Sequence, residues 1–207
     1  MIKRWITFLI GMNVLAVGII LNTKSMLGVG SINTIPYAVA YILNISLGTT
    51  TTCLYIIFII IQLILIKKLN IQILMQLPYS FVFGILLDFY DTFLNITIQS
   101  ISILFILLFM AILLTALGAF MMLQGNIVLN PADGIVKTLS DISQKEFGVV
   151  KNIFDITSII ITIIICLMTK GYIIGIGIGT ILSAILIGRC VVLYQKIYHN
   201  YRIERVL

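Results

Sequence analysis

The residues best able to do chemistry lie in a charged segment between long apolar runs. Residues 130–148 read NPADGIVKTLSDISQKEFG, and their charged side chains are Asp133, Lys137, Asp141, Lys145 and Glu146. The first four recur every four residues, so a helix would carry them on one face with alternating charge. Ionisable side chains at membrane depth are costly and mark ligand or ion sites. This segment is therefore the first candidate for a binding site.

A second polar group follows at the start of the next apolar run, where Lys151, Asn152 and Asp155 fall close together. Two interpretations of Asp155 fit this spacing. Its carboxylate pairs with Lys151 at i, i+4 as a structural lock, or it faces a cavity with Asn152 and binds a cation or a proton. Near the end of the last run, Arg189 either extends its guanidinium to the interface or binds an anionic group. A further alternative is that Arg189 pairs with Asp133 or Asp155.

The sequence also indicates an internal repeat. A shift of 100 residues aligns three pairs in the first part of the chain: Ser31 with Pro131, Asn33 with Asp133, and Gly48 with Gly148. Extra residues in the second half, two near 168–171 and two beyond, align Gly84 with Gly188. Glycines and an acid–amide pair that recur together predict two related halves, about 1–97 and 98–207.

The counterpart of the charged segment is GVGSINTIPYAVAY, residues 28–41. Both segments offer a helix N-terminus, which carries partial positive charge and unpaired N–H groups. If both enter the helix bundle, these ends converge near the repeat interface, where transporters bind small polar or ionic solutes. We expect a polar cavity there, flanked by Arg189 and lined by Ser31, Asn33, Asp133, Asn152 and Asp155.

Residues 130–148 have a second interpretation, a surface helix in the headgroup region with its lysines toward anionic lipid. Both interpretations share the same helix ends. Asn130 suits the N-cap, Pro131 the first helical position and Asp133 the third. Gly148 suits the C-terminal stop. The segment is therefore predicted to be an amphipathic helix.

No residue set points to catalysis, a metal or a cofactor. The single histidine, His199, lies in a basic tail, and the three cysteines lie inside apolar runs without metal-ligand spacing. The glycines of GYIIGIGIGT, residues 171–180, follow no strand. Close helix packing through small residues explains them better than a dinucleotide loop. We therefore expect a protein that is not an enzyme and that holds no cofactor or metal.

These polar groups must be positioned by apolar helices, because 61% of the 207 residues are hydrophobic and only 10% are charged. Soluble domains carry about 25% charged residues, and about 20 apolar residues span a bilayer as a helix. The chain is therefore predicted to be an all-α polytopic membrane protein with one domain, residues 1–207, in contact with the lipid bilayer. Its formal charge of +6 lies in loops beside the apolar runs, which indicates orientation rather than nucleic-acid binding.

The apolar runs predict six transmembrane helices, near 5–22, 49–66, 72–90, 101–123, 149–168 and 172–194. Residues 28–47 and 130–147 are the less regular segments. If these also crossed, Lys67 and Lys68 would lie outside and Asp133 would pass through lipid, against the positive-inside rule. Six spans put both termini and most lysines and arginines in the cytoplasm. Three spans in each half then make the repeat an inverted one.

Two short motifs and the last apolar run resemble a known family. LGVGSINTI (27–35) and LNPADGIV (129–136) resemble the paired turns of the YczE/YyaS/YitT family of bacterial membrane proteins, and GIGIGTILSAILIGRCV (175–191) resembles its glycine-rich last helix. The resemblance implies a six-span permease of unknown substrate in the bacterial inner membrane. Ser31 stands where the family tends to have proline and Asn33 where it tends to have an acid, whereas Asp133 keeps the acidic form.

Two functions fit this sequence. The first is a transporter, or a transporter subunit, for a small solute. The size and span number of this chain are similar to those of the substrate-binding subunits of energy-coupling-factor vitamin transporters. This similarity implies a partner ATPase module. The second is a membrane accessory or regulatory protein that acts through a partner and transports nothing itself.

Overall fold

The computed structural model describes residues 1–94 and 100–204, with side chains described as far as residue 199. All regular structure in these ranges is helical. The elements in chain order are α1 (Ile2–Lys24), the short η1 (Ser31–Asn33), α2 (Thr34–Leu43), α3 (Leu47–Ile66), α4 (Ile71–Leu74), α5 (Gln76–Phe93), α6 (Ile101–Gly125), α7 (Pro131–Ser143), α8 (Phe147–Thr169) and α9 (Ile178–Glu204).

Six helical stretches in the described ranges are long and apolar enough to cross a membrane: Ile2–Lys24, Leu47–Ile66, Ile71–Phe93, Ile101–Gly125, Phe147–Thr169 and Ile178–His199. The predicted all-α polytopic membrane fold is thereby confirmed. Their outward side chains are largely Ile, Leu, Phe and Val, as expected where the solvent is lipid. The two less regular segments form η1 with α2, and α7, which are shorter.

The last span begins later than the predicted residue 172, because residues 170–177 form no helix. Gly171 and Gly175 have φ angles of +76° and +75° in this stretch, a region that glycine adopts without steric cost. The glycines predicted to support helix packing therefore lie partly in a non-helical connection, and α9 begins only at Ile178.

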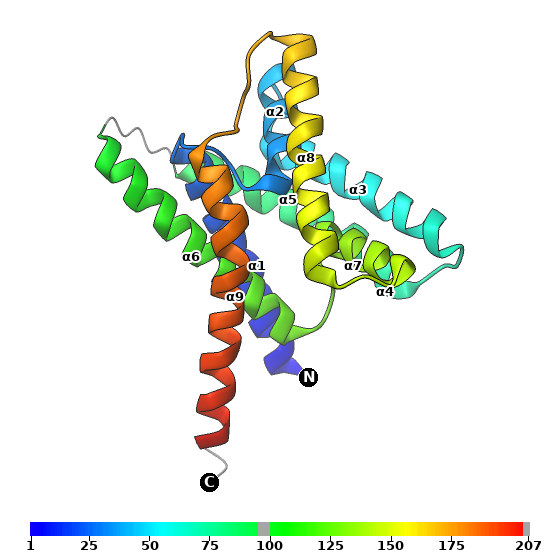
Figure 1. The fold of residues 1–207 in the computed structure, drawn as a ribbon. Helices are drawn as coiled ribbons and strands as arrows, with labels where there is room; N and C mark the ends of the chain where they lie inside the picture. The colour runs from blue at the N-terminus through cyan, green and yellow to red at the C-terminus, as the bar shows by residue number, and fades with distance from the viewer. Residues whose placement is uncertain (95–99, 205–207) are drawn as a thin grey trace.

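The first helices of the two halves, α1 and α6, lie side by side along much of their length (Figure 1). Glycines allow this close approach, because a side chain at Gly18 would overlap the backbone of Thr115 and one at Gly118 would overlap that of Leu15. Small residues at such contacts let helix backbones approach in a membrane, where van der Waals packing drives association. Arg4 adds a bond across the pair by donating to Gly125 O at 3.0 Å.

Each short segment packs against a long helix from the other half. In Figure 1, α2 lies along α8, whereas α7 lies near α3. In the main apolar core, Tyr79 stacks on Phe83 with ring centroids 5.4 Å apart, and Tyr55 stacks on Phe83 at 6.1 Å. Ala132 and Ile135 of α7 belong to the same core. The two short segments thus add to the contact that α1 and α6 make between the halves.

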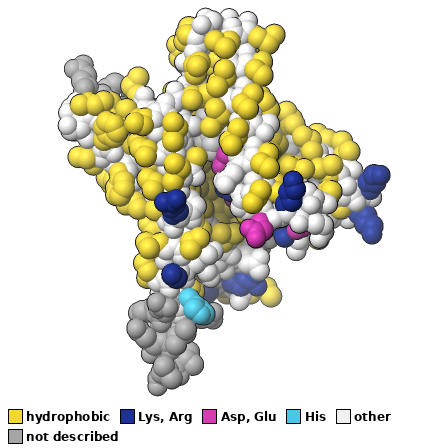
Figure 2. Space-filling model, viewed as in Figure 1, with side chains coloured by type: hydrophobic (Ala, Val, Ile, Leu, Met, Phe, Trp, Pro, Cys, Tyr) yellow, Lys and Arg dark blue, Asp and Glu magenta, His cyan; other side chains and the backbone are white. Residues whose placement is uncertain are grey.

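The charged side chains on the visible face gather toward one end of the molecule. In Figure 2 the Lys and Arg side chains lie over the lower and right-hand parts, whereas the upper part, over α2 and α8, is apolar or uncharged.

Candidate functional site

The N-terminal turn of α7 lies inside the helix bundle. Asn130 Oδ1 accepts a hydrogen bond from the Ala132 N–H at 3.0 Å, and Pro131 occupies the first turn. The predicted N-cap is therefore confirmed. Ala132 and Val136 are buried, so this turn is covered by protein rather than by solvent or lipid. The helix start thus brings Asp133 into the bundle.

The predicted stop at Gly148 is wrong, because α7 ends at Ser143 and Gly148 lies in the first turn of α8. Gln144 adopts the left-handed conformation at φ 54°. The turn is closed by side chains, since Ser140 Oγ donates to Lys145 O at 2.6 Å and Gln144 Nε2 donates to Asp141 O at 2.7 Å. These bonds satisfy carbonyls near the helix end without a glycine.

α7 packs against a pair of buried glutamines. Gln62 of α3 and Gln76 of α5 exchange two side-chain hydrogen bonds of 3.0 and 3.3 Å. A Cβ at Gly134 would come within 2.7 Å of Gln76 Nε2 and 2.9 Å of Gln62 Oε1. Glycine at position 134 therefore lets the α7 backbone approach this amide pair.

Asp133 forms an ion pair with Lys151 of α8, with Nζ and Oδ1 3.3 Å apart. One of the two sequence interpretations paired Lys151 with Asp155 instead. The ammonium bonds Asp133 because the buried start of α7 brings that carboxylate to the α8 surface, a contact between residues 18 positions apart. Lys151 and Asp155 still lie near each other on α8, so one cation lies beside two carboxylates.

The Asp155 carboxyl is the most deeply buried charged group of this cluster. Asp155 is only 7% exposed, and its Oδ1 accepts no hydrogen bond from any residue that the structure describes. The Ser31 side chain of η1 lies beside this carboxyl. Burying a polar atom without a partner costs free energy, and such an atom often marks a place for an ion or a ligand. Asp155 is therefore the centre of the candidate site.

Buried hydroxyl groups continue from Asp155 along α8 toward α2. Ser158 and Thr162 are buried, and Thr162 Oγ1 donates to Thr34 Oγ1 at 2.9 Å. Thr34 Oγ1 in turn donates to Ser31 O at 2.7 Å. The sequence interpretation missed these residues. Their signal was the spacing of 155, 158 and 162, which places all three on one helix face.

The structure brings together three of the six predicted site residues, Ser31, Asp133 and Asp155, around Lys151. Asn33 is partly exposed and ends η1, whereas Asn152 and Arg189 are exposed on α8 and α9. Of the predicted cluster, only the residues at the contact between α7, α8 and η1 lie together.

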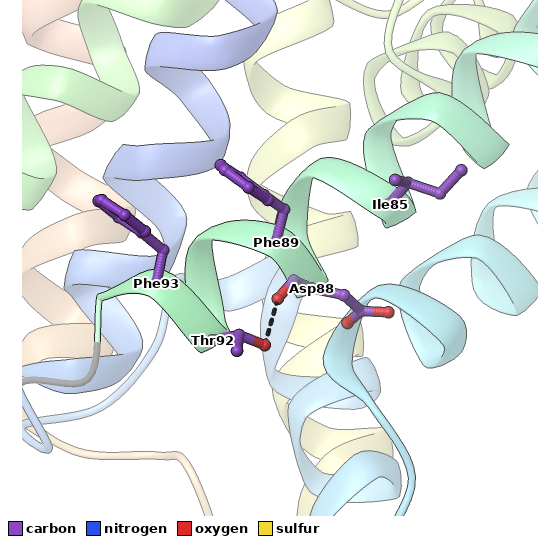
Figure 3. Close-up of a pocket in the computed structure, with 5 residues that line it drawn as sticks. All are labelled: Ile85, Asp88, Phe89, Thr92 and Phe93. Carbon is purple, nitrogen blue, oxygen red and sulfur yellow. Dashed lines mark hydrogen bonds between the residues drawn. The ribbon is translucent and has the colours of Figure 1, made fainter.

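Two surface hollows lie away from this cluster. One of about 190 Å³ is lined by Tyr37, Tyr41 and Asp91, and Lys24 binds Asp91 there at 2.7 Å. The other, of about 680 Å³, runs along α5. In Figure 3, Ile85, Phe89 and Phe93 project from α5 around this second hollow. Its apolar lining is suited to lipid.

Asp88, at the edge of the hollow in Figure 3, has a structural partner. Its carboxylate accepts hydrogen bonds of 2.7 Å from Ser46 Oγ and from the Gly48 N–H at the start of α3. Negative charge at a helix N-terminus is stabilising. Asp88 therefore caps the start of α3 and joins α5 to it.

Comparison with known proteins gives one match. No curated protein and no solved structure matches the chain. A family model described as a family of unknown function, DUF6198, matches residues 2–196. This range includes the first five spans, most of the last one, both short segments and the Asp155 cluster. The chain therefore belongs to the DUF6198 family of unknown function.

Proposed function

We propose that this protein is a transporter, or the solute-binding subunit of a transporter, for a small polar or ionic solute in the bacterial cytoplasmic membrane. The observation that carries the proposal is the buried Asp155 carboxylate with an unpartnered oxygen, located where α8 meets η1 and the start of α7. Ionisable groups inside membrane proteins are costly and are typically retained at substrate or ion pathways.

The arrangement of the helices supports the proposal. Two sets of three spans, each with a short segment after its first span, fit an inverted repeat. In such transporters the solute binds at the interface between the repeats. Asp155 occupies an equivalent place, because α8 contacts both η1 from the first half and α7 from the second. The resemblance to the YczE/YyaS/YitT family agrees with this proposal.

The charge of the site favours a cation or a proton as the species bound. Asp133 and Asp155 provide two carboxylates, and Lys151 provides one positive charge, so the fully ionised cluster carries one net negative charge. A hard cation prefers oxygen ligands, and the Asp155 and Ser31 side chains both provide them. This cation is either the transported solute or the ion that drives its transport.

Both termini are proposed to lie in the cytoplasm. Cysteine labelling of intact cells tests this orientation: positions 67 and 196 should be shielded from an impermeant reagent, and position 92 should react. Labelling at position 67 from outside would contradict the orientation.

Uptake into proteoliposomes tests the function directly. A panel of inorganic cations, amino acids and vitamins is offered to the purified protein, and Asp155→Asn is compared with Lys137→Gln. Lys137 is a matched control because it is exposed and, among the residues that the structure describes, pairs with Asp141 alone, one turn away. Uptake that Asp155→Asn abolishes and Lys137→Gln retains supports the proposal. If solute enters only when a copurified ATPase module is present, the protein is a subunit; binding of a partner without any uptake favours the accessory role.

A further inference from the structure

The two halves of the chain use equivalent glycines differently. In the first half, α3 and α5 touch through Gly48 and Gly84. A side chain at Gly48 would overlap Gly84 O and the Asp88 carboxylate, and one at Gly84 would overlap Thr52 Oγ1. Thr52 Oγ1 also donates a hydrogen bond across this contact to Ser80 O at 3.1 Å. The α3–α5 contact is therefore close and depends on both glycines.

The corresponding glycines of the second half touch nothing. Among the residues that the structure describes, and apart from the adjoining residues and the backbone of the same helix, no atom lies within 4 Å of a Cβ built at Gly148 or at Gly188. Glycine inside a helix destabilises it relative to alanine, so an open position within α9 gives no reason for Gly188. Asn152, which the repeat aligns with Thr52, is likewise exposed on α8.

The contacts of α5 and of its counterpart α9 show that α9 lacks one helix partner. In the first half α5 packs against both α1 and α3, whereas in the second half α9 packs against α6, the counterpart of α1. Figure 1 shows the reason: α8 rises to the top of the molecule while α9 extends to the bottom. The face of α9 that carries Gly188 also exposes Ile181 and Ala184.

We propose that the protein has a second conformation in which α8 and α9 dock on each other as α3 and α5 do here. Gly148 would then meet Gly188, and the Asn152 amide would donate to the backbone carbonyl at Ala184, the position that the repeat aligns with Ser80. This bond gives a polar residue at the membrane surface a partner, which interhelical amide groups favour in lipid.

The helix that docks on the face of α8 with Gly148 and Asn152 is α9 of the same chain. The pairing is encoded by the internal repeat, and the eight residues 170–177 tether the two helices, which raises their effective concentration far above that of a second copy. In the proposed orientation, Gly148 and Gly188 lie toward the cytoplasmic side, so docking would close that side. This gating role rests on the proposed transport function, whereas the docking itself does not.

Thiol cross-linking of membranes tests the docking. The native cysteines are first replaced, and Asn152→Cys with Ala184→Cys is treated with a short bifunctional thiol reagent. Thr52→Cys with Ser80→Cys is the matched control for a pair already in contact. We expect both pairs to link within one chain, the control almost completely and the test pair in part. No linking of the test pair, or linking only between chains at twice the mass, would overturn the proposal.

A second variant tests whether Gly188 takes part in the docking or only faces lipid. Gly188→Leu should abolish linking of the test pair while the melting temperature stays unchanged, because nothing lies within 4 Å of that position. Gly84→Leu should instead lower the melting temperature, since it would displace Thr52. If Gly188→Leu left linking intact, the proposed contact would be wrong. Linking needs no solute, so a failure of uptake with linking intact would contradict transport alone.

Discussion

Residues 25–33, which lead from α1 into α2, and residues 126–134, which lead from α6 into α7, both enter the helix bundle, but different groups hold them. Backbone bonds hold the first segment: the Val29 N–H donates to Gly175 O at 2.9 Å, and the Gly179 N–H donates to Leu27 O at 2.7 Å. Side chains hold the second, through the Asn130 cap and the Asp133–Lys151 pair.

This difference shows two ways to satisfy the polar groups of an irregular backbone inside a helix bundle, where protein partners replace water. The backbone-held segment presents a hydroxyl, Ser31, and carries no charge in this stretch after Lys24. The segment held by side chains presents the Asp133 carboxylate, which pairs with Lys151. Asp155 therefore lies between the neutral Ser31 side chain and the charged pair of Asp133 with Lys151.

The largest effect is expected at the backbone-held segment. Gly28 has φ +112°, and its Cβ would lie 2.6 Å from Gly177 N. Gly28→Val should therefore combine backbone strain with overpacking and lower the free energy of unfolding by about 3 kcal/mol or more. Chemical unfolding in detergent measures this loss.

Gly171 is the control for Gly28, because its φ is +76° but nothing lies within 4 Å of its Cβ. Gly171→Ala should cost only the left-handed strain, about 1–2 kcal/mol. Equal losses at the two positions would show that contact with residues 175–180 does not hold the first segment.

A smaller effect is expected where α7 meets the glutamine pair. Gln62→Leu leaves the Gln76 amide buried without its partner, which should cost about 1–3 kcal/mol. Gln62→Leu combined with Gln76→Leu should recover most of that loss, because apolar groups then replace both partners. A double variant less stable than the single one would show that the amides bind something other than each other.

The smallest effects concern the two ion pairs made by residues of α7. Lys151→Gln should lower the free energy of unfolding by about 1–2 kcal/mol, because the side chains of Lys151 and Asp133 are only 31% and 37% exposed. Lys137→Gln breaks an exposed pair and should cost less than about 0.5 kcal/mol. Thermal unfolding of both variants side by side measures the difference, and a larger loss for Lys137→Gln would contradict the assignment.

Most of the fold could be predicted from local features of the sequence. Apolar runs of spanning length predicted the six transmembrane helices, because the bilayer sets their length. Asn130 and Pro131 predicted the start of α7, because capping depends on neighbouring residues alone. The glycines of residues 170–177 were misassigned to a helix, since a non-helical connection here depends on its backbone bonds to residues 27–29.

The site could be predicted only in part, because it depends on contacts between distant residues. Helical spacing pointed Lys151 toward Asp155, but Asp133 lies 18 positions away and reaches it only through the buried start of α7. Asn152 follows Lys151 directly, yet it faces away from the cluster because adjacent helix positions point in different directions. The repeat, by contrast, aligned Gly48 with Gly148 without showing that only the first is in contact.

The central claim is that Asp155 binds the solute or its coupling ion. The most direct measurement is a thermal-shift screen of the purified protein with Na⁺, K⁺, amino acids and vitamins, repeated on Asp155→Asn. The account predicts that at least one of these compounds raises the melting temperature of the wild-type protein and has no effect on Asp155→Asn, whose own stability is near that of the wild type. Equal shifts in both proteins, or no shift of the wild type with any compound, would contradict it.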